Sequence, residues 1–187
     1  ARRVVGSIKF DIDLAARRSQ LEVIGEELGC DIKSRPLWAA ASTHPGEEQL
    51  VIDAYQALSE RGLSTRLLLA PRHPNRTGDI IKLLEKAGLK YQKRSDNVPV
   101  TIETDVLLID TLGELSAFLG LADAAFIGGS LVPRGGHNPI EAAAWGCAVI
   151  TGPHVINFAT IVRDMERGGA IRVVTDQHEL ADRLASV

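Results

Sequence analysis

The residues best suited to chemistry lie in a glycine-rich stretch from Gly128 to Phe158, GGSLVPRGGHNPIEAAAWGCAVITGPHVINF. Two pairs of glycines in this stretch allow the backbone to approach a ligand closely, because glycine has no side chain to keep it away. The Ser130 hydroxyl and the backbone amides around Gly135 and Gly136 can donate hydrogen bonds to an anion. The stretch therefore favours anion binding, although the glycines are equally consistent with an ordinary turn.

A helix is predicted to begin directly after these glycines. Asn138 suits the N-cap, Pro139 the first helical position and Glu141 the third, which is the arrangement of a capping box. The amino end of a helix also attracts negative charge. Asn138 and Glu141 are consistent with structural capping alone, and together with the neighbouring Gly129 and His137 they are typical of a cradle for a phosphate group.

Polar side chains also follow other apolar runs of the chain. Ser42 and His44 lie in STHPGEE after the first run, and Arg72 and His73 lie in PRHPNR after the second. If the runs are parallel strands, the loops that follow them open on one edge of the sheet, where α/β proteins bind their ligands. PRHPNR is equally consistent with a solvated loop. The sequence thus indicates one rim on which the candidate residues gather.

Several well-known sites are absent from the sequence. It contains no GxxxxGK[ST] loop, and its glycines follow the fourth apolar run, whereas the dinucleotide-binding GxGxxG follows the first strand. An ATPase or a nicotinamide dehydrogenase is therefore disfavoured. The five histidines and the two cysteines, Cys30 and Cys147, show no metal-ligand spacing, so we expect no metal ion and no disulfide.

Apolar runs alternate with amphipathic runs from about residue 36 onward. Several of the apolar runs are apolar at successive positions, as strands buried on both faces of a parallel sheet are. The predicted strands are Leu37–Ala41, Thr65–Ala70, Val106–Asp110, Ala124–Gly128, Ala148–Thr151 and Ala170–Val174. The amphipathic runs predict helices over 46–62, 78–88, 113–122, 138–146, 157–169 and 176–187. This alternation predicts an α/β fold with a Rossmann-like doubly wound parallel sheet.

Residues 1–35 fit the alternation poorly, and we interpret them as an inter-domain linker and an approach helix that precede one domain over residues 36–187.

A net charge of −3 and an aromatic content of only 4% argue against a nucleic-acid surface. No apolar run has the roughly 18 residues needed to cross a bilayer, so no membrane span is expected in this chain. From the residues alone, the chain is an α/β domain that binds a phosphate-bearing small molecule.

Three segments, ASTHPGEE, APRHPNR and above all the glycine-rich stretch, resemble the Kdo transferases. These are bacterial enzymes that move 3-deoxy-D-manno-octulosonic acid (Kdo) from CMP-Kdo onto a lipid A precursor. The opening GSIKFD resembles the segment that joins the two halves of that family, and the resemblance runs from about residue 4 to residue 187. It implies the glycosyltransferase-B architecture, with this chain as the carboxyl-terminal half that holds the CMP-Kdo donor.

The resemblance also implies roles for individual residues. The implied donor-binding residues are Ser42, His44, Arg72, His73, Gly129, Ser130, Gly136, His137, Asn138 and Glu141. Glu141 would contact the CMP ribose hydroxyls, and the residues of the glycine loop would lie against the phosphate. Arg72 and His73 would hold the phosphate or the cytosine edge, while Ser42 and His44 would face the donor sugar. No cofactor is implied, because CMP-Kdo is a substrate.

The resemblance implies that the general base, the lipid acceptor site and a membrane-anchoring segment lie in an amino-terminal half outside this chain. The chain by itself, a soluble fragment, would then lack the catalytic base. The implied role is in lipopolysaccharide biosynthesis at the cytoplasmic face of the bacterial inner membrane. Two alternatives stay open: half of a UDP-sugar glycosyltransferase or epimerase, and a nucleotide-binding module without catalysis of its own. Comparing CMP with UDP binding distinguishes the first alternative.

Overall fold

A computed structural model of the protein describes residues 14–187. The segment GSIKFD and the rest of residues 1–13 lie outside the described residues, as does that part of the predicted linker.

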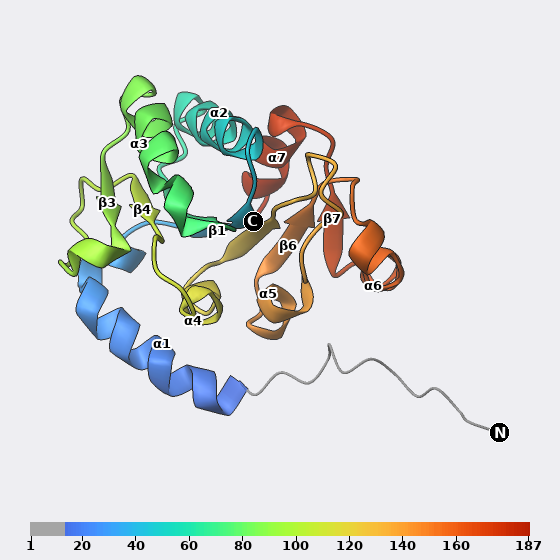
Figure 1. Ribbon diagram of the computed structural model, residues 1–187, viewed down its shortest axis with the longest axis horizontal. Coiled ribbons are helices and arrows are strands. Elements are labelled where there is room, and N and C mark those ends of the chain that lie inside the picture. The colour runs from blue at the N-terminus through green and yellow to red at the C-terminus, as the bar shows by residue number, and fades with distance from the viewer. Residues whose placement is uncertain (1–13) are drawn as a thin grey trace.

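The described chain is built on one sheet of seven parallel strands (Figure 1). The strands are β1 (Leu37–Thr43), β2 (Arg66–Pro71), β3 (Tyr91–Lys93), β4 (Val106–Leu108), β5 (Ala124–Ile127), β6 (Ala148–Thr151) and β7 (Ile171–Val173). Their order across the sheet is β3-β4-β2-β1-β5-β6-β7. Strands β2, β3 and β4 thus lie on one side of β1, and β5, β6 and β7 lie on the other, which makes the sheet doubly wound.

Helices connect the strands and cover both faces of the sheet. The α-helices are α1 (Leu14–Leu28), α2 (Glu47–Glu60), α3 (Thr77–Lys86), α4 (Leu115–Leu119), α5 (Ile140–Ala144), α6 (Ala159–Arg167) and α7 (Gln177–Leu184). The short 3-10 helices are η2 (Cys30–Lys33), η3 (Pro74–Arg76), η4 (Arg94–Asp96) and η5 (Ile156–Phe158). None of the helices between residues 14 and 187 combines the length and apolarity that crossing a bilayer requires.

Successive residues of β1 belong to two different hydrophobic cores. Ala39 and Ala41 pack on the face that α1, α4, α5 and α6 cover, and Trp38 and Ala40 pack on the face that α2, α3 and α7 cover. Figure 1 shows α2, α3 and α7 above the sheet and α1, α4 and α5 below it. Because both faces are buried, the strands have to be apolar at successive positions, as the sequence predicted.

All six predicted strands are confirmed, with ends that differ by at most two residues. The seventh strand, β3, was not predicted. Its three residues, Tyr91–Lys93, are all only half buried at the edge of the sheet, and they form no apolar run. An edge strand of three residues, of which only Tyr91 packs against a core cluster, leaves no hydrophobic pattern in the sequence.

Helix α1 and the turn after it pack into the domain. Ile24, Leu28 and Ile32 are buried in the core below the sheet, and the Val100 amide donates to the Leu28 carbonyl at 2.8 Å. Residues 14–35 thus contribute to the same hydrophobic core as the residues that follow. Because residues 1–13 are outside the described part, the domain boundary at residue 35 stays a prediction.

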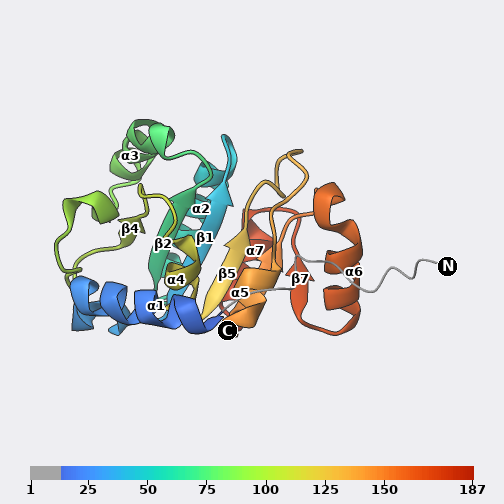
Figure 2. The same ribbon diagram turned by 60° about the horizontal axis from the view of Figure 1, so that its bottom comes forward.

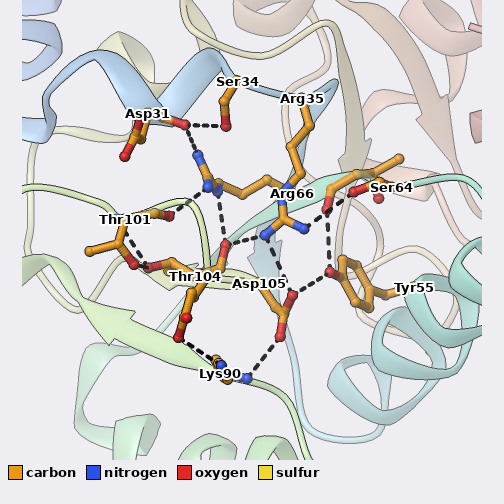
Figure 3. Close-up of polar contacts among 12 residues, drawn as sticks. Asp31, Ser34, Arg35, Tyr55, Ser64, Arg66, Lys90, Thr101, Thr104 and Asp105 are labelled. Carbon is orange, nitrogen blue, oxygen red and sulfur yellow. Dashed lines mark hydrogen bonds and ion pairs between the residues drawn. The ribbon is translucent and has the colours of Figure 1, made fainter.

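A buried arginine joins the turn after α1 to the amino-terminal edge of the sheet. Arg66, the first residue of β2, is 0% exposed and donates to the carbonyls of Asp31, Thr101 and Thr104 (Figure 3). Three carbonyls from two separate turns therefore share one guanidinium, which presents its donors in a fixed fork. This cluster stabilises the amino-terminal ends of the strands, whereas ligands are expected at the carboxyl-terminal ends.

Candidate functional site

The sheet has its topological switch point between β1 and β5. The strands built earlier in the chain lie on one side of this pair and the strands built later lie on the other. Figure 2 shows β1 and β5 side by side, with the loops that follow them at the same edge of the sheet. Ligands of doubly wound sheets bind outside the carboxyl ends of the strands at such a point. The carboxyl end of β1 with its loop (42–46) and the loop over residues 128–139 therefore form the candidate site, together with residues 72–73 of the adjacent β2 loop, whose Arg72 amide donates to the Thr43 carbonyl at 2.9 Å. We call this site the switch-point rim.

Two histidines meet across the switch-point rim. His44 from the β1 loop and His137 from the β5 loop have their Nε2 atoms 2.9 Å apart, and their rings are inclined by only 4°. In this hydrogen bond one Nε2 carries the hydrogen and the other accepts it. The His73 ring, from the loop after β2, lies edge-on to His44 with the ring centroids 5.9 Å apart. Three loops that are far apart in sequence thus bring three imidazoles together.

Burial keeps the histidine pair neutral. It lowers the pKa of His137 to about 4, and the nearby His44, Arg72 and His73 add to this effect. The pKa of His44 is also lowered, first by burial. A neutral imidazole has one N–H, and the ring that donates within the pair has used it. The accepting ring keeps its Nδ1–H, so one ring of the pair can donate to an anion without bringing a charge of its own.

The low pKa of His137 predicts that the protein loses stability in mild acid. Below its ordinary pKa of 6.5 the histidine takes up a proton in the unfolded chain, whereas it stays neutral in the folded protein down to about pH 4. The free energy of unfolding should therefore fall as the pH drops from 7 to 5, by about 1 kcal/mol after allowing for solvent screening. Urea unfolding of the wild type and of His137→Gln across this range measures the contribution.

The matched control for this experiment is His178→Gln, which changes an exposed histidine on α7. It should keep the full pH dependence, whereas His137→Gln should make the curve shallower. Equal slopes in all three proteins would contradict the assignment of a neutral His137.

A buried carboxylate that is not among the predicted donor-binding residues joins the two loops of the rim. Glu47, at the first position of α2, is 0% exposed. Its oxygens accept hydrogen bonds from the amides of His44, Gly129, Ser130 and Leu131 at 2.7 to 2.9 Å. The neighbouring Glu48 is buried as well, but it accepts from Thr43 and Arg76 instead. The pair of glutamates in GEE is visible in the sequence, although nothing there indicates which loop each one contacts.

Several predicted anion donors already have partners within the protein. The Ser130 hydroxyl donates to the Ile127 carbonyl and accepts from the Gly152 amide, and the Ser130 side chain is fully buried. The amides of Gly129 and Ser130 donate to Glu47, and the Gly136 amide donates to the Gly129 carbonyl. In this structure these three residues therefore support the loop, and their donors are not directed at the rim.

Other donors on the rim have no acceptor in the described part of the chain. Within residues 14–187, the backbone amides of His137 and Asn138 donate no hydrogen bond, and neither does the Asn138 side-chain amide. Arg72 and Arg134 are exposed and pair with no described carboxylate. Amides and arginines together provide what an anion requires.

The helix after the glycines begins one residue later than predicted. Pro139 occupies the N-cap position of α5, and Asn138 Oδ1 accepts from the Ile140 amide at 3.1 Å. Glu141 does not reach back to complete a capping box, because its carboxylate pairs with Arg17 of α1 at 3.1 Å. With only five residues, α5 adds little dipole, so the local amides and arginines dominate the attraction for an anion.

Ser42 has an unusual backbone conformation. It has φ 58° at the carboxyl end of β1, in the left-handed region that residues other than glycine rarely adopt. Gly128 lies against this bend, and a Cβ on Gly128 would be 2.6 Å from the Ser42 carbonyl oxygen. Such strain persists only where the surroundings enforce it, and it is typical of functional sites.

Open space adjoins the rim between the β5 and β6 loops. A cavity of about 390 Å³ is lined by Pro133, Gly135, Pro153, His154, Val155, Ile156 and Ala159. Among residues 14–187, the acidic, histidine and cysteine side chains form no group suited to a metal ion.

The fold and the rim define the chain as a Rossmann-like domain of the glycosyltransferase-B type. No protein-family model matches the chain. It is 39% identical over 164 residues to the 3-deoxy-D-manno-octulosonic acid transferase of Haemophilus influenzae, a match that covers 86% of this chain and 37% of the relative. It is 40% identical over 183 residues to the transferase of the same name from Bordetella pertussis, covering 96% of this chain and 42% of the relative. The chain thus spans about two fifths of the length of these relatives.

A solved structure matches the fold over nearly the whole chain. The crystal structure of the C-terminal CMP-Kdo binding domain of WaaA from Acinetobacter baumannii superposes with a TM-score of 0.84 at 28% identity. The match covers 92% of this chain and 89% of that one. The chain therefore belongs to the family of 3-deoxy-D-manno-octulosonic acid transferases, and it corresponds to their carboxyl-terminal domain.

Proposed function

We propose that this chain is the donor-binding half of a glycosyltransferase and that it binds CMP-Kdo at the switch-point rim. The observation that carries the proposal is the set of donors that converge there: the amides of His137 and Asn138, the neutral histidine pair, and the exposed Arg72 and Arg134. The similarity to a CMP-Kdo binding domain supports the choice of nucleotide.

The chemistry of Kdo transfer fits a rim of this kind. When the bond between Kdo and CMP breaks, CMP leaves as a phosphate monoester and the phosphate gathers negative charge. Fixed N–H donors and guanidinium groups stabilise this charge more in the transition state than in the ground state, so they accelerate the reaction. Arg72 and His73 would act from the β2 loop, and Arg134 from the β5 loop. No metal ion and no cofactor are required for these steps.

The geometry refines the proposed roles of individual residues. His137 and Asn138 offer donors to the phosphate, whereas Gly129, Ser130 and Gly136 hold the loop that presents them. Glu141 is proposed to accept hydrogen bonds from the ribose hydroxyls, in place of its ion pair with Arg17.

Ser42 and His44 are proposed to face the sugar. Ser42 lies at the strained end of β1, and His44 lies beside it in the same loop.

The remaining parts of the reaction are assigned to other parts of the enzyme. We propose that an amino-terminal half supplies the general base and binds the lipid A precursor, and that the enzyme acts in lipopolysaccharide biosynthesis at the cytoplasmic face of the bacterial inner membrane. The chain spans only about two fifths of its curated relatives, which leaves room for such a half in the enzyme. Mixing the chain with that half and measuring Kdo transfer tests this part of the proposal.

Calorimetric titration with CMP tests the donor site directly. The chain should bind CMP in preference to UDP. Arg72→Ala and Arg134→Ala should each weaken CMP binding about tenfold or more, because each removes one charge-assisted interaction with the phosphate. The CMP affinity of the double variant should be reduced by the product of the two single fold-changes, provided that the arginines act independently.

Arg183→Ala is the matched control, since Arg183 is an exposed arginine that lines a cavity with Ala148 and Ile171 at the opposite edge of the sheet. It should bind CMP as the wild type does. Unchanged affinity in the Arg72 and Arg134 variants would contradict the proposed site, and tighter binding of UDP than CMP would contradict the proposed nucleotide.

A further inference from the structure

We infer that Glu47 is a positioning residue of the donor site, whose carboxylate fixes the two loops that carry His44 and His137. The inference rests on the proposed function, because it gives Glu47 a part in presenting donors to the phosphate of the nucleotide. Glu47 itself is fully buried, so it acts through other residues and does not touch the ligand.

The four hydrogen bonds of Glu47 are divided between the two loops. Oε2 accepts from the His44 amide at 2.9 Å and from the Gly129 amide at 2.7 Å. Oε1 accepts from the amides of Ser130 and Leu131, both at 2.9 Å. One carboxylate oxygen thus bridges the two loops across the switch point, and the other holds the turn that follows β5. The β1 loop and the β5 loop cannot separate without breaking at least one of these bonds.

Backbone hydrogen bonds connect each histidine of the pair to the Glu47 carboxylate. His44 is held through its own amide. His137 is held through Gly129, because the Gly129 carbonyl accepts from the amide of Gly136, the residue before His137. Both rings also pack over Gly129: a Cβ at that position would lie 3.2 Å from His137 Nε2 and 3.3 Å from His44 Cδ2. The Nε2 to Nε2 separation of 2.9 Å therefore depends on where Glu47 holds Gly129 and His44.

The chemistry of the side chain is as important as its position. Each carboxylate oxygen accepts two N–H groups, so both oxygens have to be acceptors. Glutamine has the same shape but would turn an NH₂ group toward two N–H donors, and those backbone amides would lose their acceptor. Aspartate keeps both acceptors but is shorter by one methylene, so it reaches only part of the set. The inference thus predicts that the isosteric change is the more harmful one.

The experiment uses the 187-residue chain with Glu47→Gln and Glu47→Asp, and it measures CMP affinity and the titration of the His137 ring by NMR. Glu47→Gln should bind CMP at least tenfold more weakly, because the donors are no longer held in place. The pKa of His137 should rise from about 4 toward its ordinary value as the pair separates and water enters. Glu47→Asp should lie between the wild type and Glu47→Gln in both measurements.

Asp105→Asn provides the matched control. Asp105 also accepts several hydrogen bonds, from the Lys90 amide at 3.0 Å, the Tyr55 hydroxyl at 3.1 Å and Arg35 (Figure 3). It directly precedes β4, so it lies at the amino-terminal ends of the strands, away from the switch-point rim. This variant should lower the melting temperature while leaving CMP affinity and the His137 titration unchanged. If Glu47 had a merely structural role, its variants would likewise change the melting temperature and leave CMP affinity and the His137 titration unchanged.

The outcomes separate the inference from the proposed function. If folded Glu47→Gln keeps the wild-type titration of His137, the inference is wrong, whatever happens to CMP affinity. If the wild type does not bind CMP, the proposed function fails, and the His137 titration still decides the role of Glu47. Should Glu47→Gln not fold, hydrogen exchange of the wild type decides: the amides of Gly129, Ser130 and Leu131 should exchange slowly, and rapid exchange would overturn the inference.

Discussion

Replacing Arg66 by methionine is expected to lower the free energy of unfolding by about 3 kcal/mol. The Arg66 side chain is 0% exposed and supplies donors to the carbonyls of Asp31, Thr101 and Thr104 (Figure 3). Methionine fills a similar space but donates nothing, so three hydrogen bonds from a charged donor are lost, each worth about 1.5 to 3 kcal/mol. The carbonyls keep other donors, namely Ser34, Arg35 and the Thr104 amide, and these limit the loss. Relief from burying the guanidinium charge offsets part of this loss.

Urea unfolding followed by circular dichroism measures the effect of Arg66→Met. Arg183→Met makes the same substitution at an exposed arginine of α7, where the free energy of unfolding should change by less than about 0.5 kcal/mol. Because the Arg66 cluster lies at the edge of the sheet opposite to the switch-point rim, CMP affinity of the folded variant should remain that of the wild type. Equal stability of the two variants would show that the carbonyls do not depend on Arg66.

Gly152→Ala is expected to destabilise the protein by about 3 kcal/mol or more and to weaken the candidate site at the same time. A Cβ on Gly152 would lie 2.3 Å from the Ser130 carbonyl oxygen and 2.6 Å from the Leu131 amide nitrogen. Both are backbone atoms of the β5 loop, so no side-chain rotation can make room, and overpacking of this kind costs about 1 to 3 kcal/mol even where the surroundings relax. The loop that would have to move also contains the amides bound by Glu47.

Gly78→Ala provides the control for Gly152→Ala. Gly78 lies in the first turn of α3, has no atom within 4 Å of the added Cβ and does not need a left-handed backbone. Alanine there should stabilise the protein by about 0.5 to 1 kcal/mol, because it favours the helix and restricts the unfolded chain. Thermal unfolding compares the two variants directly. A Gly152→Ala protein as stable as the wild type would mean that β6 does not pack closely on the β5 loop.

The sequence determined the fold class of this protein through patterns that are local. Each long strand is an uninterrupted apolar run and each long helix carries an apolar stripe, because burial on two faces or on one face imposes those patterns residue by residue. The parallel arrangement then follows, because a helix between two strands returns the chain to the same edge of the sheet, through a right-handed connection. Strand β3 was not predicted because it is a three-residue edge strand whose side chains are only half buried, so it forms no apolar run.

The sequence also determined which loops carry the candidate site, because polar residues and glycines follow the strands in a doubly wound sheet. Tertiary structure alone decided which of those residues contact one another. His44 and His137 are 93 positions apart, and Glu47 and Gly129 are 82 positions apart. Such separations along the chain leave no periodic signal in the sequence, because each contact depends on how β1 and β5 pair within the sheet.

The same reason explains why the sequence could not indicate the partners that Ser130 and Glu141 have within the folded chain. Ser130 and Glu141 carry polar groups beside the glycines, and composition makes both suitable ligands. The folded chain turns the Ser130 hydroxyl inward to Ile127 and Gly152 and pairs Glu141 with Arg17. Sequence fixes the chemical groups available at an edge of the sheet, but the partners that satisfy those groups are chosen by packing between segments far apart in the chain.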